Sequence, residues 1–278
     1  MAKHLFIALG LLALVACAAP APTPASTPTR ISPTATNPPP TSTLAPTLPP
    51  PTATATLAPT TTPTGAPVSP TPLQTTFIDS SWDVFRADAL DLNITGKSLT
   101  LNLIKPALWF NNQQGALVYK LINGNFKATA AVSARKRSNP AQAPSSAVHL
   151  GGIMARNPVG VGAGGTENYV FIVVGFDVDD LSVETKTTVN NNSQFEGPSW
   201  GTSDAELRMC RIANVFYLFK RRIGAPTWTL AATHQRPDLP ATLQVGANIY
   251  SLNNPDLRVT YENLRIENVA DRASCERD

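Results

Sequence analysis

The sequence predicts an all-β fold, an antiparallel β-sandwich or jelly roll, over residues 76–270. Hydrophobic and polar residues alternate in several short runs, most clearly over 126–135 and 243–249. Alternation with a period of two is typical of strands that bury one face. Turn-forming residues separate these runs, and no run of ten residues shows the periodicity of a helix. Many short strands at close spacing favour two stacked sheets.

The strands can be taken in chain order. Residues 99–103 and 126–135 alternate, and Asn123-Gly124 between them predicts a hairpin. The run 169–176 is apolar except for Gly175, which predicts a central strand covered on both faces. After Val259 and Tyr261 the alternation changes phase, and a β-bulge at Glu262-Asn263 would account for the change.

Residues 1–16 have the layout of a signal peptide. Lys3 precedes an apolar run over 5–14, and small residues follow it. This run is too short to span a bilayer. The end of the segment, Leu14-Val15-Ala16-Cys17, resembles the bacterial lipobox. The resemblance implies that Cys17 is acylated and becomes the mature N-terminus. The protein would then be an exported lipoprotein, anchored on the outer side of the bacterial cytoplasmic membrane or at the cell surface. An ordinary signal peptide that releases a soluble protein is the alternative.

Residues 17–75 predict a disordered stalk behind the lipidated cysteine. Of the 26 prolines in the chain, 17 fall within 18–75, where Thr, Ala and Ser are also frequent and Arg30 is the single charge. Proline prevents helices and sheets from propagating, and such a segment buries too little apolar surface to offset its ordering entropy. The domain boundaries are therefore 1–16, 17–75, 76–270 and a polar tail, 271–278.

The charge of the chain argues against nucleic acid as a partner. Lys and Arg number 22 against 19 Asp and Glu. Two of the basic residues, Lys3 and Arg30, precede the folded region, so the charges of the domain nearly balance. A basic surface of the kind that binds nucleic acid is not predicted. The membrane, through the lipid, is one expected partner, and the aromatic and amide side chains described below favour a polysaccharide or other glycan as another.

The order of motifs in the domain resembles the concanavalin A-like lectin and glucanase superfamily, in particular the branch related to the C-terminal domain of β-xylosidases. The matching segments, in order, are 115–132, 151–156, 168–171, 206–211, 216–219, 227–229 and 245–246. The resemblance implies a curved sandwich with a concave face. Residues 223–226 depart from the pattern, because Ile-Gly-Ala-Pro stands where the branch often has Asp-Gly.

Catalytic members of that superfamily carry a Glu-x-Asp-x-Glu strand whose carboxylates flank a glycosidic bond. This chain has no such motif, so no catalytic residue is assigned. The nearest cluster is Asp177, Asp179, Asp180 and Glu184. A solvated acidic turn is the preferred interpretation of this cluster. A Ca²⁺ site formed by the three aspartates is a weaker one, and a catalytic pair is the weakest. No other cofactor is expected.

Aromatic and amide side chains supply the candidate ligand contacts. Trp109 adjoins a polar turn and Trp200 lies in a loop, so both are expected to be accessible and could stack on sugar rings. Asn191 and Asn192 could bond sugar hydroxyl groups. Packing roles for these four residues remain open, and Trp228 is expected in the core.

Cys210 and Cys275 are the two cysteines left once Cys17 is acylated, which makes them a candidate disulfide in an oxidising compartment. Two separate thiols are the alternative.

Three functions remain open. The first is a surface-displayed, lipid-anchored binding module without catalytic activity, with a glycan as the ligand. The second is an atypical glycoside hydrolase on the same fold. The third is a structural envelope lipoprotein without a small ligand.

Overall fold

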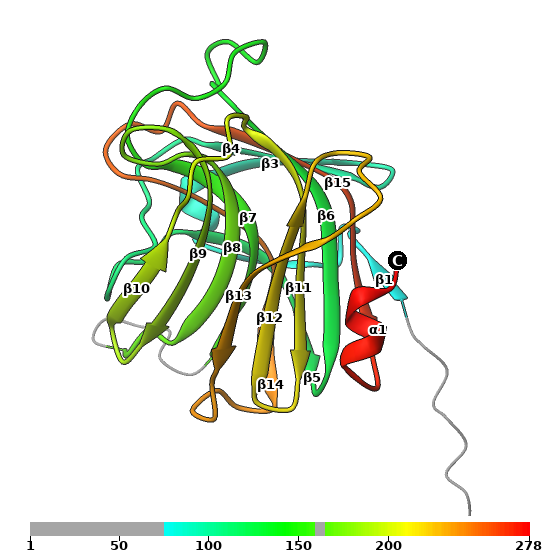
Figure 1. Ribbon diagram of the computed structural model, residues 1–278. Coiled ribbons are helices and arrows are strands. Elements are labelled where there is room, and N and C mark those ends of the chain that lie inside the picture. The colour runs from blue at the N-terminus through cyan, green and yellow to red at the C-terminus, as the bar shows by residue number, and fades with distance from the viewer. Residues whose placement is uncertain (1–74, 159–164) are drawn as a thin grey trace, which may run out of the picture. The chain divides into compact units, whose positions relative to one another are not determined.

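A computed structural model describes residues 75–158 and 165–278, which form two stacked antiparallel sheets (Figure 1). Sheet A has the order β13–β12–β11–β6–β15–β4–β3, with β1 also paired to β15. Sheet B has the order β10–β9–β8–β7–β14–β5–β2. The strands of sheet A are β1 (Thr75–Phe77), β3 (Leu90–Thr95), β4 (Ser98–Leu103), β6 (Phe126–Arg135), β11 (Asp204–Ile212), β12 (Val215–Arg221), β13 (Thr229–Gln235) and β15 (Arg258–Asn268). Those of sheet B are β2 (Asp83–Phe85), β5 (Ala116–Asn123), β7 (His149–Arg156), β8 (Tyr169–Phe176), β9 (Leu181–Val189), β10 (Asn192–Glu196) and β14 (Thr242–Ser251). The predicted all-β sandwich is confirmed.

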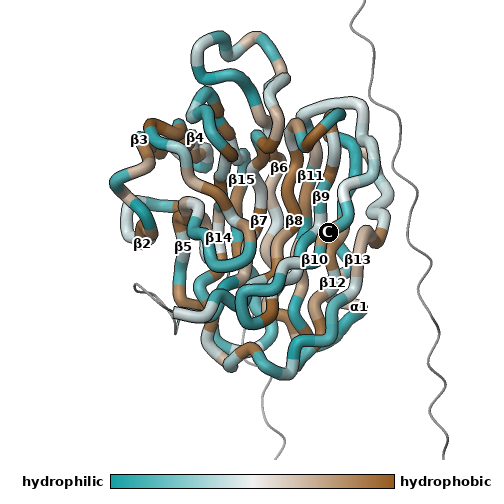
Figure 2. Tube along the Cα trace, turned by 90° about the vertical axis from the view of Figure 1, so that its left-hand side faces the viewer, coloured by the Kyte–Doolittle hydropathy of each residue, from teal (hydrophilic) through white to brown (hydrophobic). Residues whose placement is uncertain are grey.

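The main core lies between the two sheets. Alternate residues of the long central strands point into it, as Ala128, Ala130 and Val132 do on β6. In Figure 2 the hydrophobic colour runs along the central strands of both sheets. Strand β8 is buried almost throughout, so the prediction of a strand covered on both faces is confirmed. Sheet B therefore has a second covered face, on the side away from sheet A.

The predicted hairpin at Asn123-Gly124 is wrong. Strand β5, which ends at Asn123, pairs with β14 and β2 in sheet B, whereas β6 pairs with β11 and β15 in sheet A. The chain thus crosses from one sheet to the other at this turn. Gly124 adopts a left-handed backbone conformation at this turn (φ 79°). Its N–H donates to the carbonyl of Ala241 and not to a hairpin partner. Asn123-Gly124 does form a tight turn, but the local sequence does not say which sheet each flanking strand joins.

The bulge predicted in the last long strand is confirmed. The register between β15 and β6 shifts between Glu262 and Arg265. Asn263 adopts a left-handed conformation (φ 53°), and its N–H bonds the carbonyl of Lys97. The extra residue lets Leu264 and Ile266 rejoin the core side of the sheet.

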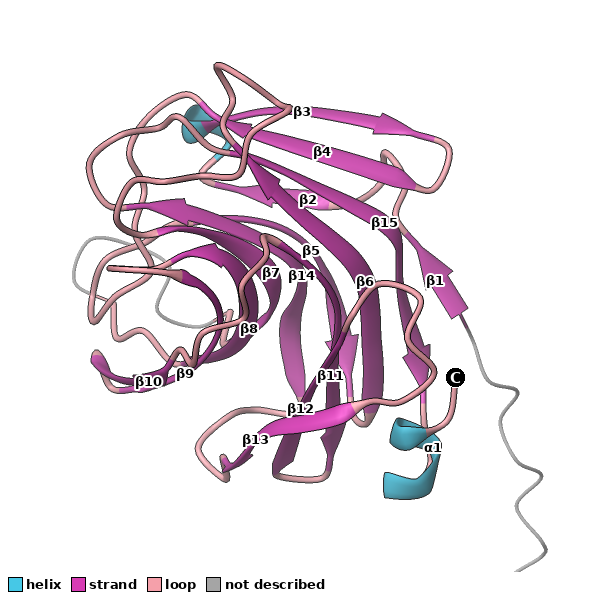
Figure 3. Cartoon of the chain, turned by 45° about the horizontal axis from the view of Figure 1, so that its top comes forward, coloured by secondary structure: helices cyan, strands magenta, loops and turns pink. Residues whose placement is uncertain are grey.

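The tail that follows β15 folds against the outer face of sheet A. A short helix, α1, spans Arg272–Glu276. Asp271 caps its N-terminal end, because the Asp271 side chain accepts a hydrogen bond from the Ser274 N–H. A disulfide joins Cys275 of this helix to Cys210 of β11, with the two Cα atoms 5.8 Å apart. Figure 3 shows α1 beside the end of sheet A.

No helix among residues 75–158 and 165–278 is long and apolar enough to cross a membrane. The expected signal peptide, Cys17 and nearly all of the expected stalk lie outside the described residues.

Candidate ligand-binding pocket on the seven-stranded sheet

The outer face of sheet B is covered by the chain itself. The segment between β4 and β5, residues 104–115, runs over this face, and Trp109 is its buried centre. The Trp109 ring packs against Phe85 and Tyr169 at centroid distances of 5.9 and 5.4 Å. Trp109 is 0% exposed, so the expectation that it is an accessible sugar contact is wrong. The hydrophobic run of β8 requires a cover, and Trp109 supplies it.

A buried ion pair fixes the polar side of this cover. Arg156 of β7 and Glu167, just before β8, are each 1% exposed and approach to 2.6 Å. The side-chain amide of Gln114 donates to Glu167 at 2.6 Å, and Arg156 donates to the side-chain oxygen of Gln244 at 2.8 Å. Because every charged group here has a partner, the pair can be buried without leaving an unpaired charge. This part of the face is therefore filled by protein.

A pocket of about 170 Å³ opens on this face where β8 ends and β9 begins. We call it the outer-face pocket. It is lined by Leu108, Phe110, Val148, Asp177, Val178, Glu184, Lys186, Phe195 and Leu252. Its volume lies below the range of about 300–1,000 Å³ usual for drug-sized ligands. The pocket therefore suits a group about as large as one sugar residue.

The floor of the pocket is an ion pair surrounded by aromatic rings. Lys186 Nζ lies 3.0 Å from Glu184 Oε1, and it donates to the carbonyl of Trp109 at 3.1 Å. The Tyr250 hydroxyl donates to the same Glu184 oxygen at 3.1 Å. Lys186 Nζ also lies 4.9 Å from the ring centroid of Phe195, a favourable cation–π distance. Burial raises the pKa of Glu184, and the nearby Lys186 offsets part of this rise.

Asp177 brings a second carboxylate to the rim. It follows β8 directly and is half-buried, and burial raises its pKa. Gly197 lies between Asp177 and Glu184: a Cβ atom at residue 197 would stand 2.9 Å from Asp177 Oδ2 and 3.7 Å from the Glu184 Cβ. A side chain there would press on the Asp177 carboxylate and would contact Glu184, so the glycine keeps the space beside Asp177 open.

The pocket combines apolar walls with a hydrogen-bond acceptor. Phe195 is 49% exposed and Val178 is 58% exposed, which gives a ligand an apolar surface to lie on. A carboxylate accepts hydrogen bonds from hydroxyl groups, and hydrogen bonds to charged groups are worth about 1.5–3 kcal/mol. Sugars present an apolar ring face together with a hydroxyl edge, so this arrangement matches the chemistry of a sugar ring.

The other predicted contacts do not gather at one site. Trp200 is half-buried against the main core, and its ring N–H donates to the Asp204 carbonyl at 2.9 Å. Asn191 is a turn residue with φ 66°, whose side-chain oxygen accepts from the Glu167 N–H. The backbone N–H of Trp200 donates to the carbonyl of Leu181 at the start of β9, whereas Asn191 and Asn192 follow the end of that strand. Trp200 and the two asparagines therefore lie near opposite ends of β9.

The acidic turn and Trp228 also take definite places. Asp180 accepts a hydrogen bond from the Leu181 N–H, and its carbonyl accepts from Asp177 N–H, as in an ordinary tight turn. Within the described ranges, no three His, Cys, Asp or Glu side chains are grouped so that they could hold a metal ion, and this includes Asp177, Asp179 and Asp180. Trp228 is half-buried on the outer side of sheet A, so its expected place in the main core is wrong.

Sequence reasoning missed Phe110, Lys186 and Phe195 as pocket residues. The sequence does carry a signal for one of them, Lys186. Glu184 and Lys186 are alternate residues of one strand, so they share a face, and they follow a strand that is apolar on both sides. Charged side chains on a covered face need partners. Pairing of Glu184 with Lys186 could have been expected, but the approach of Phe110 from a distant loop could not.

Comparisons with solved structures show the same fold. A functionally unknown protein from Saccharomyces cerevisiae superposes with a TM-score of 0.51 and 15% identity, covering 72% of this chain and 97% of that one. Basic winged bean lectin with Tn-antigen gives 0.47 and 12%, covering 70% and 98%. Xylan β-1,4-xylosidase from Bacillus halodurans gives 0.46 and 12%, covering 63% of this chain and 33% of that one. No family model and no curated protein matches the chain. At these identities the likeness shows the fold alone, an antiparallel sandwich of two sheets.

Proposed function

We propose that this protein binds carbohydrate without cleaving it, through the outer-face pocket. One observation carries the proposal. A half-buried carboxylate, Asp177, and the exposed aromatic ring of Phe195 line the same pocket, which is about the size of one sugar residue. Binding is expected to be weak, because a small pocket buries little surface and because hydroxyl groups exchange water for protein at small net gain.

Display at the membrane is the second part of the proposal. An acylated Cys17 and the proline-rich stalk over 18–75 would hold the domain outside the lipid surface. A binding domain on a tether can reach glycans that lie away from the membrane. The support for this part is the sequence of the N-terminal segment.

Hydrolysis is the second candidate function, because burial raises the pKa of both Asp177 and Glu184. A carboxyl group with a raised pKa can act as a general acid, and glycosidases pair one such acid with a second, ionised carboxylate. The geometry favours binding. Glu184 is 1% exposed and is bonded to Lys186 and Tyr250, so its carboxylate does not face a bound sugar.

The full chain, tested on a glycan array and then by titration with the strongest glycan, decides between these functions. Asp177→Asn and Phe195→Ala should each weaken binding by about tenfold or more, because the first replaces a charged acceptor with a neutral one and the second removes the aromatic surface. Asp180→Asn is the matched control, since Asp180 lies in the same turn but outside the pocket lining, and it should bind as wild type does. Equal binding by Asp177→Asn and wild type would refute the pocket. Release of reducing sugar that Glu184→Gln abolishes would establish hydrolysis instead.

A further inference from the structure

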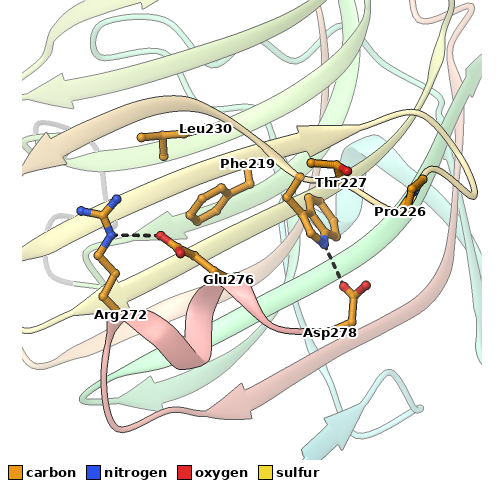
Figure 4. A pocket seen from close by; sticks show the side chains of 8 residues that line it. Phe219, Pro226, Thr227, Leu230, Arg272, Glu276 and Asp278 are labelled. Atoms are coloured by element: carbon orange, nitrogen blue, oxygen red, sulfur yellow. Dashed lines mark hydrogen bonds and ion pairs between the residues drawn. The ribbon is translucent and has the colours of Figure 1, made fainter.

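The side chain of Asp278 lies in a ring of donors on the outer face of sheet A, away from the outer-face pocket. Its Oδ1 accepts from Arg208 Nη2 at 2.6 Å and from Trp228 Nε1 at 2.8 Å, and its Oδ2 accepts from Arg221 Nη1 at 2.8 Å. Figure 4 marks the hydrogen bond from the Trp228 ring to the labelled Asp278 carboxylate as a dashed line. Two guanidinium groups and an indole N–H thus converge on one carboxylate, a strong arrangement for binding an anion.

The three donors are held in place by the sheet. Arg208 belongs to β11 and is 0% exposed, and Arg221 of the neighbouring β12 is paired with Glu206 across the two strands. The guanidinium carbons of Arg208 and Arg221 lie 4.0 and 4.3 Å from the centroid of the Trp228 ring. Arg208 Nε is buried and finds no hydrogen-bond partner among the described residues. The donor set is therefore prearranged, and it retains unused donor capacity.

The Asp278 side chain is more exposed to solvent than the two arginines that bind it. Asp278 follows α1, and the residue between them, Arg277, has an extended backbone (φ −78°, ψ 146°). The side chain of Asp278 remains 57% exposed although it makes these bonds. The disulfide fixes α1 at Cys275, three residues earlier. The Asp278 carboxylate is therefore open to solvent on one side, whereas α1 behind it is fixed by the disulfide.

A pocket of about 430 Å³ adjoins this carboxylate. Its lining residues are Phe219, Pro226, Thr227, Trp228, Leu230, Arg272, Glu276 and Asp278. Figure 4 shows Phe219 and Leu230 as its apolar side and Asp278 at one end. The volume lies within the usual range for small-molecule sites, about 300–1,000 Å³. A ring placed on the apolar side would bring an attached carboxylate toward the position that Asp278 now occupies.

We propose that Arg208, Arg221 and Trp228 form a binding site for a carboxylate carried on a small ring, and that Asp278 occupies this site as an internal ligand. The ligand class is a ring-bearing carboxylic acid, either an acidic sugar or an aromatic acid. A tethered carboxylate competes at an effective concentration in the millimolar range, so the site opens only to ligands that outcompete it. The lowered pKa of Asp278, caused by its bonds to Trp228 and Arg221, keeps this competitor charged.

Titration of the full chain with glucuronate and with benzoate tests the proposal, and glucose and benzyl alcohol serve as uncharged counterparts. Asp278→Ala should bind one of the two acids at least tenfold more tightly than wild type, and the uncharged counterparts should gain nothing. Tightening for glucuronate assigns an acidic sugar, and tightening for benzoate assigns an aromatic acid. The proposal is overturned if neither acid binds Asp278→Ala more tightly than wild type, or if the uncharged compounds gain equally.

A second variant pair guards against loss of folding. Adding Arg221→Gln to Asp278→Ala should abolish the gain. Adding Arg222→Gln should preserve it, because Arg222 lies outside the pocket lining and donates to the Trp200 carbonyl instead. Melting curves of all variants identify any that unfold. Equal binding by both double variants while both remain folded would also overturn the proposal. Because this site and the outer-face pocket lie on different sheets, either proposal can fail without the other.

Discussion

Trp109 holds residues 104–115 against the outer face of sheet B. Its ring is fully buried among Phe85, Tyr169 and the side chains beneath them, and its N–H donates to the Ala116 carbonyl at 3.4 Å. Gly115 approaches the ring so closely that a Cβ atom there would lie 2.4 Å from it. The segment is therefore closely fitted around this single side chain.

We expect Trp109→Ala to lower the free energy of unfolding by about 3–5 kcal/mol, the usual loss for a large aromatic residue in a core. Urea unfolding at neutral pH measures it. Phe195→Ala is the control, because Phe195 is half-exposed, and its loss should be much smaller. Similar losses in the two variants would show that residues 104–115 do not depend on Trp109 for their packing.

Glu184 gives the domain a pH dependence whose sign follows from its burial. Its pKa in the folded protein is raised above the ordinary value of 4.5. Between these two values the folded state binds more protons than the unfolded state, so the free energy of unfolding falls as pH rises through this window. Gln at this position does not titrate.

The Glu184→Gln variant should therefore lose less stability than wild type as pH rises from about 4.5 to 7, although its absolute stability is lower because Lys186 loses its partner. Urea unfolding at several pH values gives both slopes. Parallel slopes would mean that Glu184 titrates no differently in the folded and unfolded states.

At the scale of elements, the β9–β10 hairpin depends on two left-handed asparagines. Asn190 and Asn191 have φ angles of 49° and 66°, a conformation that asparagine tolerates better than other non-glycine residues. The Asn191 side chain also ties the turn to Glu167 through the Glu167 N–H, at 2.6 Å. The amide-rich sequence thus builds a turn.

Asn191→Ala should destabilise the domain by about 1–2 kcal/mol, the cost of a left-handed conformation for an ordinary residue. Asn192→Ala, at an exposed position of β10, should change stability by less than about 0.5 kcal/mol. Thermal unfolding of the pair measures the difference. Glycan binding should survive both substitutions. Loss of binding in Asn192→Ala alone would show that Asn192 contacts the ligand.

At the scale of the whole molecule, the proposed lipid anchor at Cys17 would decide where the domain works. If Cys17 is acylated, the protein partitions with membranes. Cys17→Ser should shift it to the soluble or secreted fraction, measured by cell fractionation and immunoblotting. The folded domain should be unaffected, because the substitution lies far outside residues 75–278. A Cys17→Ser protein that stays with the membrane as wild type does would exclude lipid anchoring through this residue.

The sequence by itself determined the class of the fold and many of its local features. Period-two alternation, the apolar run of β8 and the bulge near Glu262 each depend on a few neighbouring residues, and the backbone geometry of a strand turns such patterns directly into faces. The chemistry of the turn at Gly124 is local in the same way.

The tertiary structure alone decided which strands share a sheet, what covers sheet B, and where a ligand could bind. Asn123-Gly124 joins two sheets because β5 and β6 find partners far away in the sequence. The outer-face pocket joins Phe110, Asp177, Phe195 and Leu252, and the donors around Asp278 lie on three separate segments. Contacts between distant segments depend on the packing of the whole chain, and no local pattern encodes them.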